Sequence, residues 1–144
     1  PNFYEEVVST PAIWTWPARI APGASRPDMV SAFDLVPTLC DLTPAELPAA
    51  ALPGRSYLPL VQGKPLPKKQ PWRSTSFLTA PNAGVAHDDR YKLILRNQGK
   101  GPNELYDLRA DARERVNQVD NPQFLTVTTQ LTGELARWRQ KYSV

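Results

Sequence analysis

Alternating polar and apolar residues predict a strand in the second half of the chain. The segment 104–108 reads Glu-Leu-Tyr-Asp-Leu, and this alternation has the period of a half-buried strand. Leu105 and Asp107 would then face one side of a sheet, and Tyr106 and Leu108 the other. The aromatic and leucine content of the segment supports the prediction of a strand.

Three further segments have the composition of strands. Residues 85–87 and 91–96 are predicted to form a hairpin around residues 88–90, and residues 74–79 a strand before it. In the second arm of the hairpin, Tyr91, Leu93 and Leu95 share one face, and Lys92, Ile94 and Arg96 share the other. With the segment 104–108, these strands predict an antiparallel sheet of about four strands.

The end of the chain is predicted to form an amphipathic helix. Asn121 suits the N-cap, and Pro122 suits the first helical position. Apolar residues then recur every three or four positions over about five turns, at Phe124, Val127, Leu131, Leu135, Trp138 and Tyr142. Because an antiparallel sheet needs an apolar cover on at least one face, we expect this helix to supply it. The second half is therefore predicted to be an α+β unit.

The first half is rich in short elements and loops. A helix is predicted over 35–42, with Asp34 as its N-cap and Leu35, Leu39 and Leu42 as one apolar face. The other predicted elements are a buried strand over 12–16, a short strand over 29–33 that leads into the helix, a short turn after the capping box 43–46, a loop over 48–54 and a turn over 57–62 capped by Ser56 and ended by Gly63.

Proline content supports this division. The chain has 16 prolines in 144 residues, about double the usual ~5%, and Lys64–Pro71 combines three of them with three lysines. We interpret residues 64–73 as a linker between a first part, 1–63, and a second part, 74–144. A basic arm for nucleic acid is the alternative interpretation of the same segment.

Composition narrows the function classes. The net charge of +3 and a pI near 9.2 fit an anionic substrate or nucleic acid, although a mildly basic surface is the simpler interpretation. The single Cys excludes an internal disulfide and a site with several cysteine ligands. No apolar run approaches ~18 residues, so nothing is predicted to span a membrane, and no signal peptide is recognised. The favoured interpretation involves no membrane, and a membrane-surface role for the helix at the end of the chain is the alternative. The first residue is not Met, which fits a fragment.

Few residues are candidates for chemistry. His87 is the one histidine and the one base of the type that activates a nucleophile, but its acidic neighbours in sequence do not make a triad, and a turn histidine is the favoured interpretation. Cys40 lies on the apolar side of the helix 35–42 and is expected to be a buried, inert thiol. Acidic residues such as Asp107 and Glu114 suit turns and caps. No catalytic and no metal-ligating residue is predicted in this chain.

Several motifs in a fixed order resemble the sulfatases of the alkaline-phosphatase superfamily. The central segment Glu104–Asn117 resembles the C-terminal signature of that family, with Ala112 where proline is usual. The other motifs that carry the resemblance are Phe3-Tyr4-Glu5-Glu6 with Trp16-Pro17, Val30-Ser31 with Asp34–Leu42, Gly54-Arg55-Ser56-Tyr57-Leu58-Pro59-Leu60 with Gly63, Trp72-Arg73, and Arg90–Ile94. Together they cover nearly the whole chain.

The resemblance implies a fold and a chemistry. Sulfatases have a large α/β catalytic domain and a small C-terminal antiparallel sheet covered by a helix, so 1–63 would be the tail of the catalytic domain and 74–144 the subdomain. The family uses a formylglycine nucleophile, made in the motif C/S-x-P/A-x-R, and calcium. Cys40-Asp41-Leu42 is not that motif, and the metal segment of the family would fall before residue 1. No cofactor is therefore expected in this chain itself.

Three functional hypotheses follow. The first is the C-terminal fragment of a sulfatase, a sulfuric ester hydrolase, inactive alone and completing the fold and one wall of the pocket for a sulfate ester; its partner would be the N-terminal catalytic portion. The second is the same part of a phosphodiesterase or phosphonate monoester hydrolase. The third is a polyanion-binding module. The resemblance implies His87 as a substrate contact and favours a periplasmic or secreted location over a cytoplasmic one.

Overall fold

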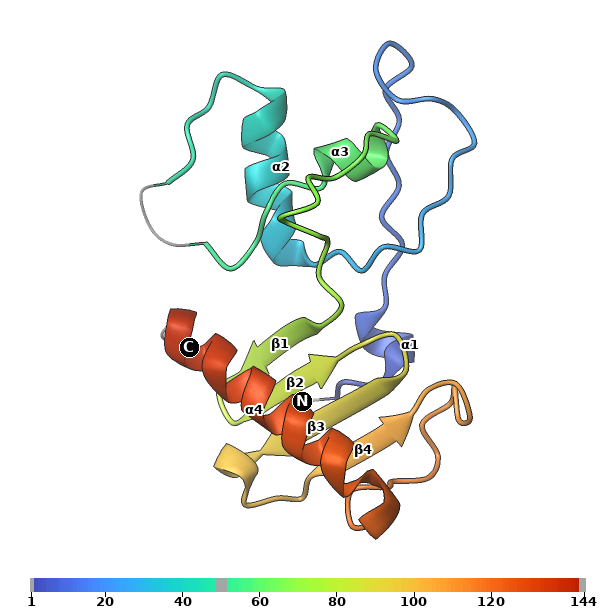
Figure 1. Cartoon of the computed structure of the whole chain (residues 1–144), viewed down its shortest axis with the longest axis vertical. Coiled ribbons are helices and arrows are strands. Elements are labelled where there is room, and N and C mark those ends of the chain that lie inside the picture. The colour runs from blue at the N-terminus through green and yellow to red at the C-terminus, as the bar shows by residue number, and fades with distance from the viewer. Residues whose placement is uncertain (1, 49–51, 143–144) are drawn as a thin grey trace. The chain divides into compact units, whose positions relative to one another are not determined.

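The computed structural model describes residues 2–48 and 52–142 (Figure 1). Residues 49–51 of the predicted loop 48–54, the first residue of the first predicted part and the last two residues of the second lie outside the described residues. The chain divides into two compact units, one made of residues 1–10 with 74–144 and one of residues 11–73. We call them the sheet unit and the loop unit.

The sheet unit contains the predicted four-stranded antiparallel sheet (Figure 1). Its strands lie in sequence order, each paired with the next, so hairpin-like connections suffice. Their bounds are β1 Ser76–Ala80, β2 Ala83–His87, β3 Tyr91–Arg96 and β4 Glu104–Asp107. The prediction of the fold class is confirmed, and Leu105 and Tyr106 of β4 join buried clusters on opposite faces of the sheet, as predicted.

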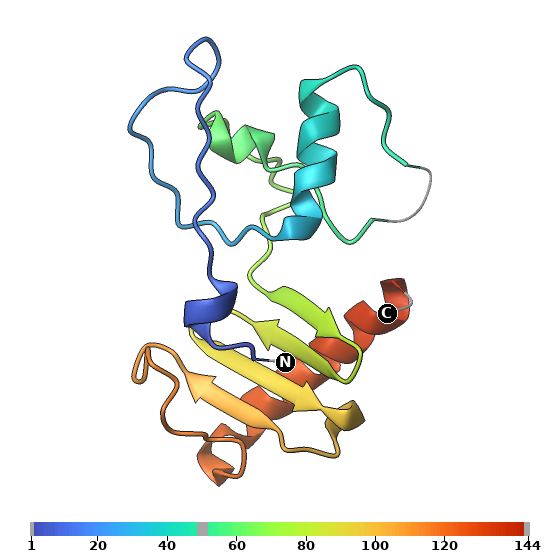
Figure 2. The ribbon, with the colours of Figure 1, turned by 180° about the vertical axis from the view of Figure 1, so that it is seen from behind.

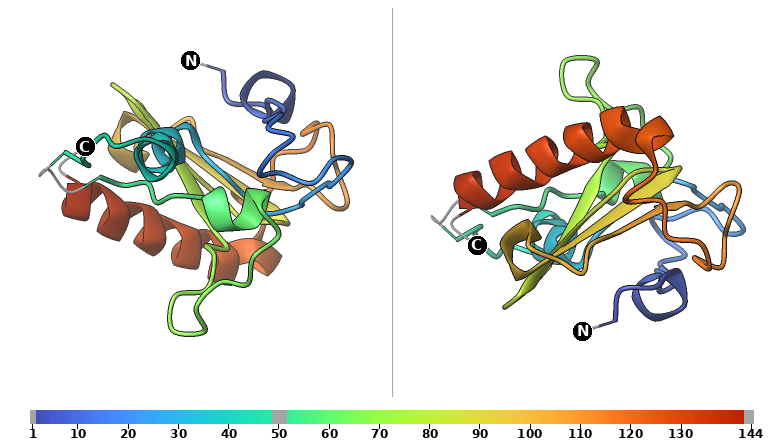
Figure 3. Two further views of the ribbon diagram at one scale, coloured as in Figure 1. Left: turned by 90° about the horizontal axis from the view of Figure 1, so that it is seen from above. Right: turned by 90° about the horizontal axis from the view of Figure 1, so that it is seen from below.

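Helix α4, Leu125–Tyr142, covers one face of the sheet, as its apolar spacing predicts (Figure 3). It follows a short 3-10 turn, η3, Pro122–Phe124, where the side chain of Asn121 accepts a hydrogen bond from Gln123 N as predicted for a cap. The buried cluster on this face joins both elements, and its members are Ala86, Leu93, Leu105, Leu131 and Leu135.

The opposite face of the sheet is covered by the beginning of the chain. Helix α1, Glu5–Val8, lies on the side of the sheet away from α4 (Figure 2), and Phe3 joins the buried cluster there with Val85, Ile94 and Tyr106. The sheet therefore has apolar packing on both faces. The sequence pattern predicted a cover for one face, because the segment that covers the other is more than 70 residues away along the chain.

The loop unit contains helix α2, Leu35–Leu42, with the predicted bounds, and the single turn of α3, Leu58–Val61. The predicted strands over 12–16 and 29–33 are wrong: the first has no regular structure, with Ile13 85% exposed, and the second ends in a 3-10 turn, η1, Ala32–Asp34. Short apolar runs form strands only where a neighbour pairs with their backbone, and no described segment does so here.

Three local predictions in this unit need correction. Asp34 has helical backbone angles and makes no side-chain bond to the first turn of α2; its carboxylate binds elsewhere, as described below. The capping box 43–46 starts no helix, although Thr43 Oγ1 accepts a hydrogen bond from Ala45 N. Cys40 is half-buried, and its Sγ lies 3.7 Å from the carbonyl of Glu46. The apolar residues Leu35 and Leu39 are each 43% exposed.

Candidate functional site

His87, the candidate substrate contact, is the last residue of β2 and lies opposite Lys92 of β3 in the hairpin. Its side chain is 19% exposed, and its Nδ1 atom lies 3.8 Å from Glu5 Oε1 of α1. The histidine is therefore not an isolated turn residue. It stands at the edge of a group of ionisable side chains, which we call the Lys92 cluster: Glu5, His87, Lys92 and Glu114.

Lys92 is fully buried at the centre of this cluster. Its Nζ atom donates to the carbonyl of Phe3 and to Glu114 Oε1, both at 2.8 Å. It also forms a close ion pair with Glu5 Oε1, which lies 2.6 Å away. A buried ammonium is tolerated only when it is paired and hydrogen-bonded, and here three oxygen atoms surround it.

Glu114 fixes the beginning of the chain to the sheet. Its other oxygen, Oε2, accepts a hydrogen bond of 2.5 Å from the backbone N–H of Glu5, while its own backbone has a φ of 52°, in the left-handed region. Glycine adopts that region freely and Asn and Asp adopt it readily, whereas other residues adopt it at some cost. The ion pair and the hydrogen bond hold Glu114 in place, so the cluster links three distant segments of the sheet unit.

Burial decides the charge of His87. Loss of hydration lowers the pKa of His87 below its ordinary value, and Lys92 acts in the same direction, while Glu5 opposes both. The net shift is downward, so the imidazole is neutral at neutral pH and can both donate and accept a hydrogen bond. Such a group suits a polar contact rather than a fixed positive charge. The assignment of His87 to substrate binding stays a prediction.

The loop unit has its own buried charge, Asp34, which is fully buried. Its Oδ2 atom accepts hydrogen bonds from Ser31 N and from Arg73 Nη1, each at 2.8 Å. Its Oδ1 atom accepts from Arg55 N at 2.9 Å and pairs with Arg73 Nη2. This set, the Asp34 network, connects the start of α2 with two segments that follow it, and every acceptor on the carboxylate is used.

The same region is tightened by close backbone contact and by aromatic packing. A Cβ atom at Gly54 would overlap the carbonyl of Phe33, so only glycine fits there. The guanidinium of Arg55 lies 4.2 Å from the ring centre of Trp72, whose Nε1 donates to the carbonyl of Met29 at 2.7 Å. These contacts therefore join residues of three sequence motifs, Asp34–Leu42, Gly54–Gly63 and Trp72-Arg73, and fix the local conformation.

Of the acidic residues predicted to serve turns, Asp88 and Asp107 do so, whereas the side chain of Glu114 is buried against Lys92 instead. Asp88 Oδ1 accepts from Arg90 N and Tyr91 N in the β2–β3 hairpin. Asp107 is paired with Arg90, whose hydrogen bond lowers the pKa of Asp107. Asn117 Oδ1 accepts from Leu105 N, which extends the bonding of β4. These contacts give the polar residues of the segment 104–117 a structural role.

The described residues include no cluster of side chains suited to a metal ion. Across residues 2–48 and 52–142, no group of three or more His, Cys, Asp or Glu side chains is placed to hold a metal ion. Cys40 is followed by Leu42 and Pro44 where a formylglycine motif would need Pro or Ala and then Arg. We therefore derive no catalytic step from calcium or formylglycine here. Among the described helices, none is long and apolar enough to cross a bilayer.

The Lys92 cluster and the role of Arg73 were not predicted from the sequence. Lys92 and Leu93 lie on opposite faces of β3. Nothing in the local sequence pattern shows that the face with Lys92 is covered by another segment. The order of the family motifs was the one available signal, because Glu5 and Glu114 both lie inside motifs of the sulfatase resemblance. It identified the segments but not the contacts between them.

Comparisons with known proteins agree with this architecture. The model of the C-terminal region of N-sulphoglucosamine sulphohydrolase matches residues 2–141. The chain is 31% identical over 131 residues to the Delta 4,5-hexuronate-2-O-sulfatase of Bacteroides thetaiotaomicron, covering 85% of this chain and 27% of that protein. It is 31% identical over 143 residues to arylsulfatase A of Bos taurus, covering 82% and 27%.

Among solved structures, the phosphonate monoester hydrolase of Agrobacterium radiobacter has the same fold, with a TM-score of 0.62 and 23% identity over 76% of this chain and 24% of that one. The fold is thus that of a C-terminal region of the sulfatase type. The chain belongs to the family described by the C-terminal region of N-sulphoglucosamine sulphohydrolase. It spans about a quarter of the length of the curated relatives that it matches, 27% of each.

Proposed function

We propose that this chain is the C-terminal part of a sulfatase, a sulfuric ester hydrolase whose nucleophile and calcium site lie in a catalytic portion that precedes it. The observation that carries the proposal is the family match over residues 2–141 combined with coverage of 27% of each curated relative. The chain itself would complete the fold and form one wall of the substrate pocket, with His87 as a polar contact. A periplasmic or secreted location is part of the proposal.

Exposed apolar surface on α2 supports the need for a further portion. Leu35, Val36 and Leu39 are 43–47% exposed, although their spacing is that of a buried helix face. Burial of an aliphatic side chain is worth about 1.5–3 kcal/mol, so a catalytic portion that covers these residues would stabilise the loop unit. The proposed partner of this face is therefore the N-terminal catalytic portion of the same protein.

The test is hydrolysis of 4-nitrophenyl sulfate with added calcium. We expect turnover by the complete polypeptide and none by residues 1–144 alone, because the described residues offer neither a formylglycine motif nor a metal-binding group. Turnover by residues 1–144 alone would contradict the location of the nucleophile. Failure of the complete polypeptide to cleave any sulfate ester would contradict the proposed activity.

A phosphodiester or phosphonate monoester hydrolase is the second candidate. The structural similarity to the Agrobacterium enzyme favours it, and the C-terminal regions of the two classes share this fold. The complete polypeptide should be tested on matched 4-nitrophenyl esters, one a sulfate and one a phenyl phosphonate. A higher kcat/KM for the sulfate is expected, and the reverse order would favour the second candidate.

A polyanion-binding module is the third candidate, supported only by the net charge of +3. It would bind a sulfated polymer or nucleic acid with an affinity that falls steeply with salt, since each neutralised anion releases a counterion. The absence of such binding at low ionic strength would rule out this third candidate.

A further inference from the structure

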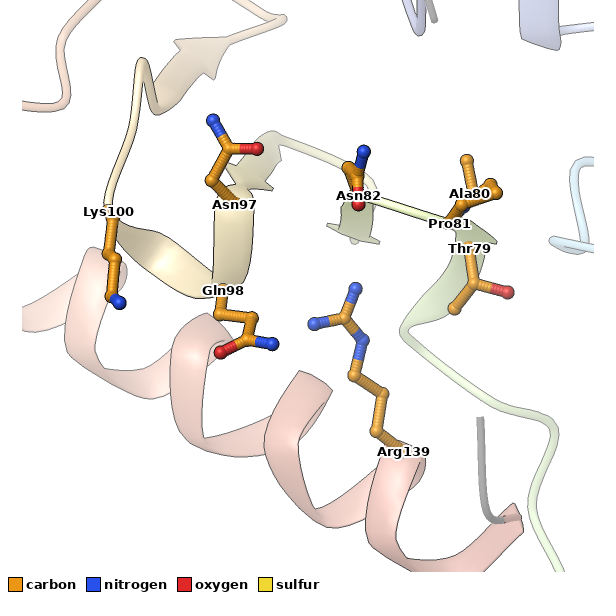
Figure 4. Close-up of a pocket in the computed structure, with 8 residues that line it drawn as sticks. All are labelled: Thr79, Ala80, Pro81, Asn82, Asn97, Gln98, Lys100 and Arg139. Atoms are coloured by element: carbon orange, nitrogen blue, oxygen red, sulfur yellow. The ribbon is translucent and has the colours of Figure 1, made fainter.

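A cavity of about 490 Å³ lies in the sheet unit, where two turns of the sheet face the last turns of α4 (Figure 4). One wall is the end of β1 with the β1–β2 turn, and the second is the 3-10 turn η2, Asn97–Gly99, with Lys100. Asn97 N donates to the carbonyl of Asn82 at 2.8 Å, which ties these two turns together. Arg139 of α4 supplies the third wall.

The cavity is cationic. Arg139 and Lys100 carry positive charges, and the remaining polar lining consists of amides and a hydroxyl, from Asn82, Asn97, Gln98 and Thr79. None of the described residues that line it has a carboxylate. An anion inside would therefore meet two cations and several neutral donors without any repulsion from a nearby acid.

The absence of a side chain at Gly84 of β2 allows Arg139 to approach the sheet closely. A Cβ atom at Gly84 would overlap the guanidinium and would lie 2.8 Å from Arg139 Cζ. Gly84 is buried in an inner strand, where glycine weakens a strand and typically marks a close approach. Here the group that approaches is the planar end of Arg139, which points from α4 into the cavity (Figure 4).

This guanidinium has no acidic partner. Across the part of the chain that the structure describes, no hydrogen bond or ion pair is formed by the side chain of Arg139. Arg90 and Arg96, which also belong to the sheet unit, pair with Asp107 and Glu104 at 2.7 Å. A half-buried arginine that is packed against the sheet yet keeps its donors open is arranged to receive an anion from solution.

We propose that this cavity, the Arg139 cavity, binds the sulfate group of a sulfated saccharide. A guanidinium donates two parallel hydrogen bonds to an oxyanion, Lys100 adds a second positive charge, and the amides can pair with sugar hydroxyls. The volume lies within the ~300–1,000 Å³ of sites for small ligands. The inference of an anion site does not depend on the proposed function. The choice of a sulfate rather than a carboxylate as the anion rests on the proposed function.

The test is calorimetric titration of the complete polypeptide in the presence of a chelator, so that metal-dependent hydrolysis does not consume the probe. The probes are glucose 6-sulfate, glucose and glucuronate. We expect glucose 6-sulfate to bind more tightly than glucuronate, and glucose not to bind. Absence of binding by glucose 6-sulfate at millimolar concentration would overturn the proposal, and equal binding by glucose would do the same.

Two variants locate the binding. Arg139→Gln should weaken glucose 6-sulfate by at least about tenfold, since a charge-assisted hydrogen bond is worth about one order of magnitude in Kd. Gly84→Ala should weaken it similarly by displacing the guanidinium while keeping its charge. Arg137→Gln is the matched control, because Arg137 is exposed on the same end of α4 and does not line the cavity. Equal affinities of Arg139→Gln and Arg137→Gln would overturn the proposal.

Hydrolysis of 4-nitrophenyl sulfate, measured in parallel with calcium, separates this inference from the proposed function. Binding that depends on Arg139, without hydrolysis of this or any other sulfate ester, would support the cavity and remove the sulfatase assignment. Hydrolysis by the wild type, with binding that does not depend on Arg139, would support the assignment and remove the cavity. Thermal unfolding of each variant checks that the sheet unit remains folded.

Discussion

The sheet unit and the loop unit are each organised around one fully buried charge, but they neutralise it in different ways. In the sheet unit, Lys92 is paired with two carboxylates, those of Glu5 and Glu114. In the loop unit, Asp34 is bound by two backbone N–H groups and by Arg73. The first arrangement joins side chains from distant segments, and the second fixes the path of the backbone itself.

The apolar surroundings of the two charges differ as well. The sheet around Lys92 has a buried apolar cluster on each face, whereas the buried apolar side chains described in the loop unit are Ile20, Pro37, Tyr57 and Leu60. A unit with little apolar burial relies more on directed hydrogen bonds for a defined shape. We infer that the sheet unit owes its stability mainly to packing and that the loop unit owes its conformation to Asp34.

The largest effect is expected from Lys92→Ala. It leaves the carboxylates of Glu5 and Glu114 close together without their cation, and removal of one partner of a buried ion pair costs about 3–5 kcal/mol. Urea unfolding of the purified protein measures the change. Lys100→Ala is the control, because Lys100 is exposed and should change stability by less than about 0.5 kcal/mol. A loss below about 1 kcal/mol for Lys92→Ala would show that the cluster is not a structural centre.

A smaller and more local effect is expected from Asp34→Ala. The N–H groups of Ser31 and Arg55 lose their acceptor, and an unsatisfied buried group costs about 1–3 kcal/mol. Hydrogen exchange should therefore accelerate at the amides of Ser31 and Arg55 and stay unchanged at Leu93 in the sheet. Asp28→Ala, which removes a partly exposed ion pair with Arg26, is the control. Faster exchange at Leu93 would mean that the two units do not depend on different interactions.

Local pattern was enough to predict the sheet, because each of its elements carries its own periodicity. The alternation in β3 and β4 and the three-to-four spacing of α4 can be recognised without knowing their partners, and the structure places those residues as expected. Hairpin connections also keep neighbours in sequence next to one another in the sheet. These features depend on interactions that are short in sequence.

The rest could not be predicted for the opposite reason. Lys92 interacts with Phe3, 89 positions away, and with Glu114, 22 positions away, so its burial leaves no local signal. Asp34 was predicted to cap α2 because Asp before an apolar run is typical of a cap. Two residues from later in the chain, Arg55 and Arg73, donate to its carboxylate instead. Exposed apolar residues on α2 likewise give the pattern of a buried helix.

The smallest effect is expected from the titration of His87. It tests whether burial or the negative charge of the Lys92 cluster dominates the pKa of His87. Burial lowers the pKa of His87 in the folded protein below the value near 6.5 of the unfolded chain. As pH falls through that value, the unfolded state binds the proton first, so stability is full above about pH 6.5 and decreases below it, by at most about 1.4 kcal/mol per pH unit.

His87→Gln keeps a polar side chain and removes this titration. Urea unfolding at pH 7.5 and pH 5.5 should therefore show a smaller loss of stability for the variant than for the wild type. If the wild type instead loses less stability on acidification than the variant, the folded protein binds the proton more readily, and Glu5 outweighs burial. The imidazole would then be a cation at the edge of the cluster, and a substrate contact by His87 would be a charged one.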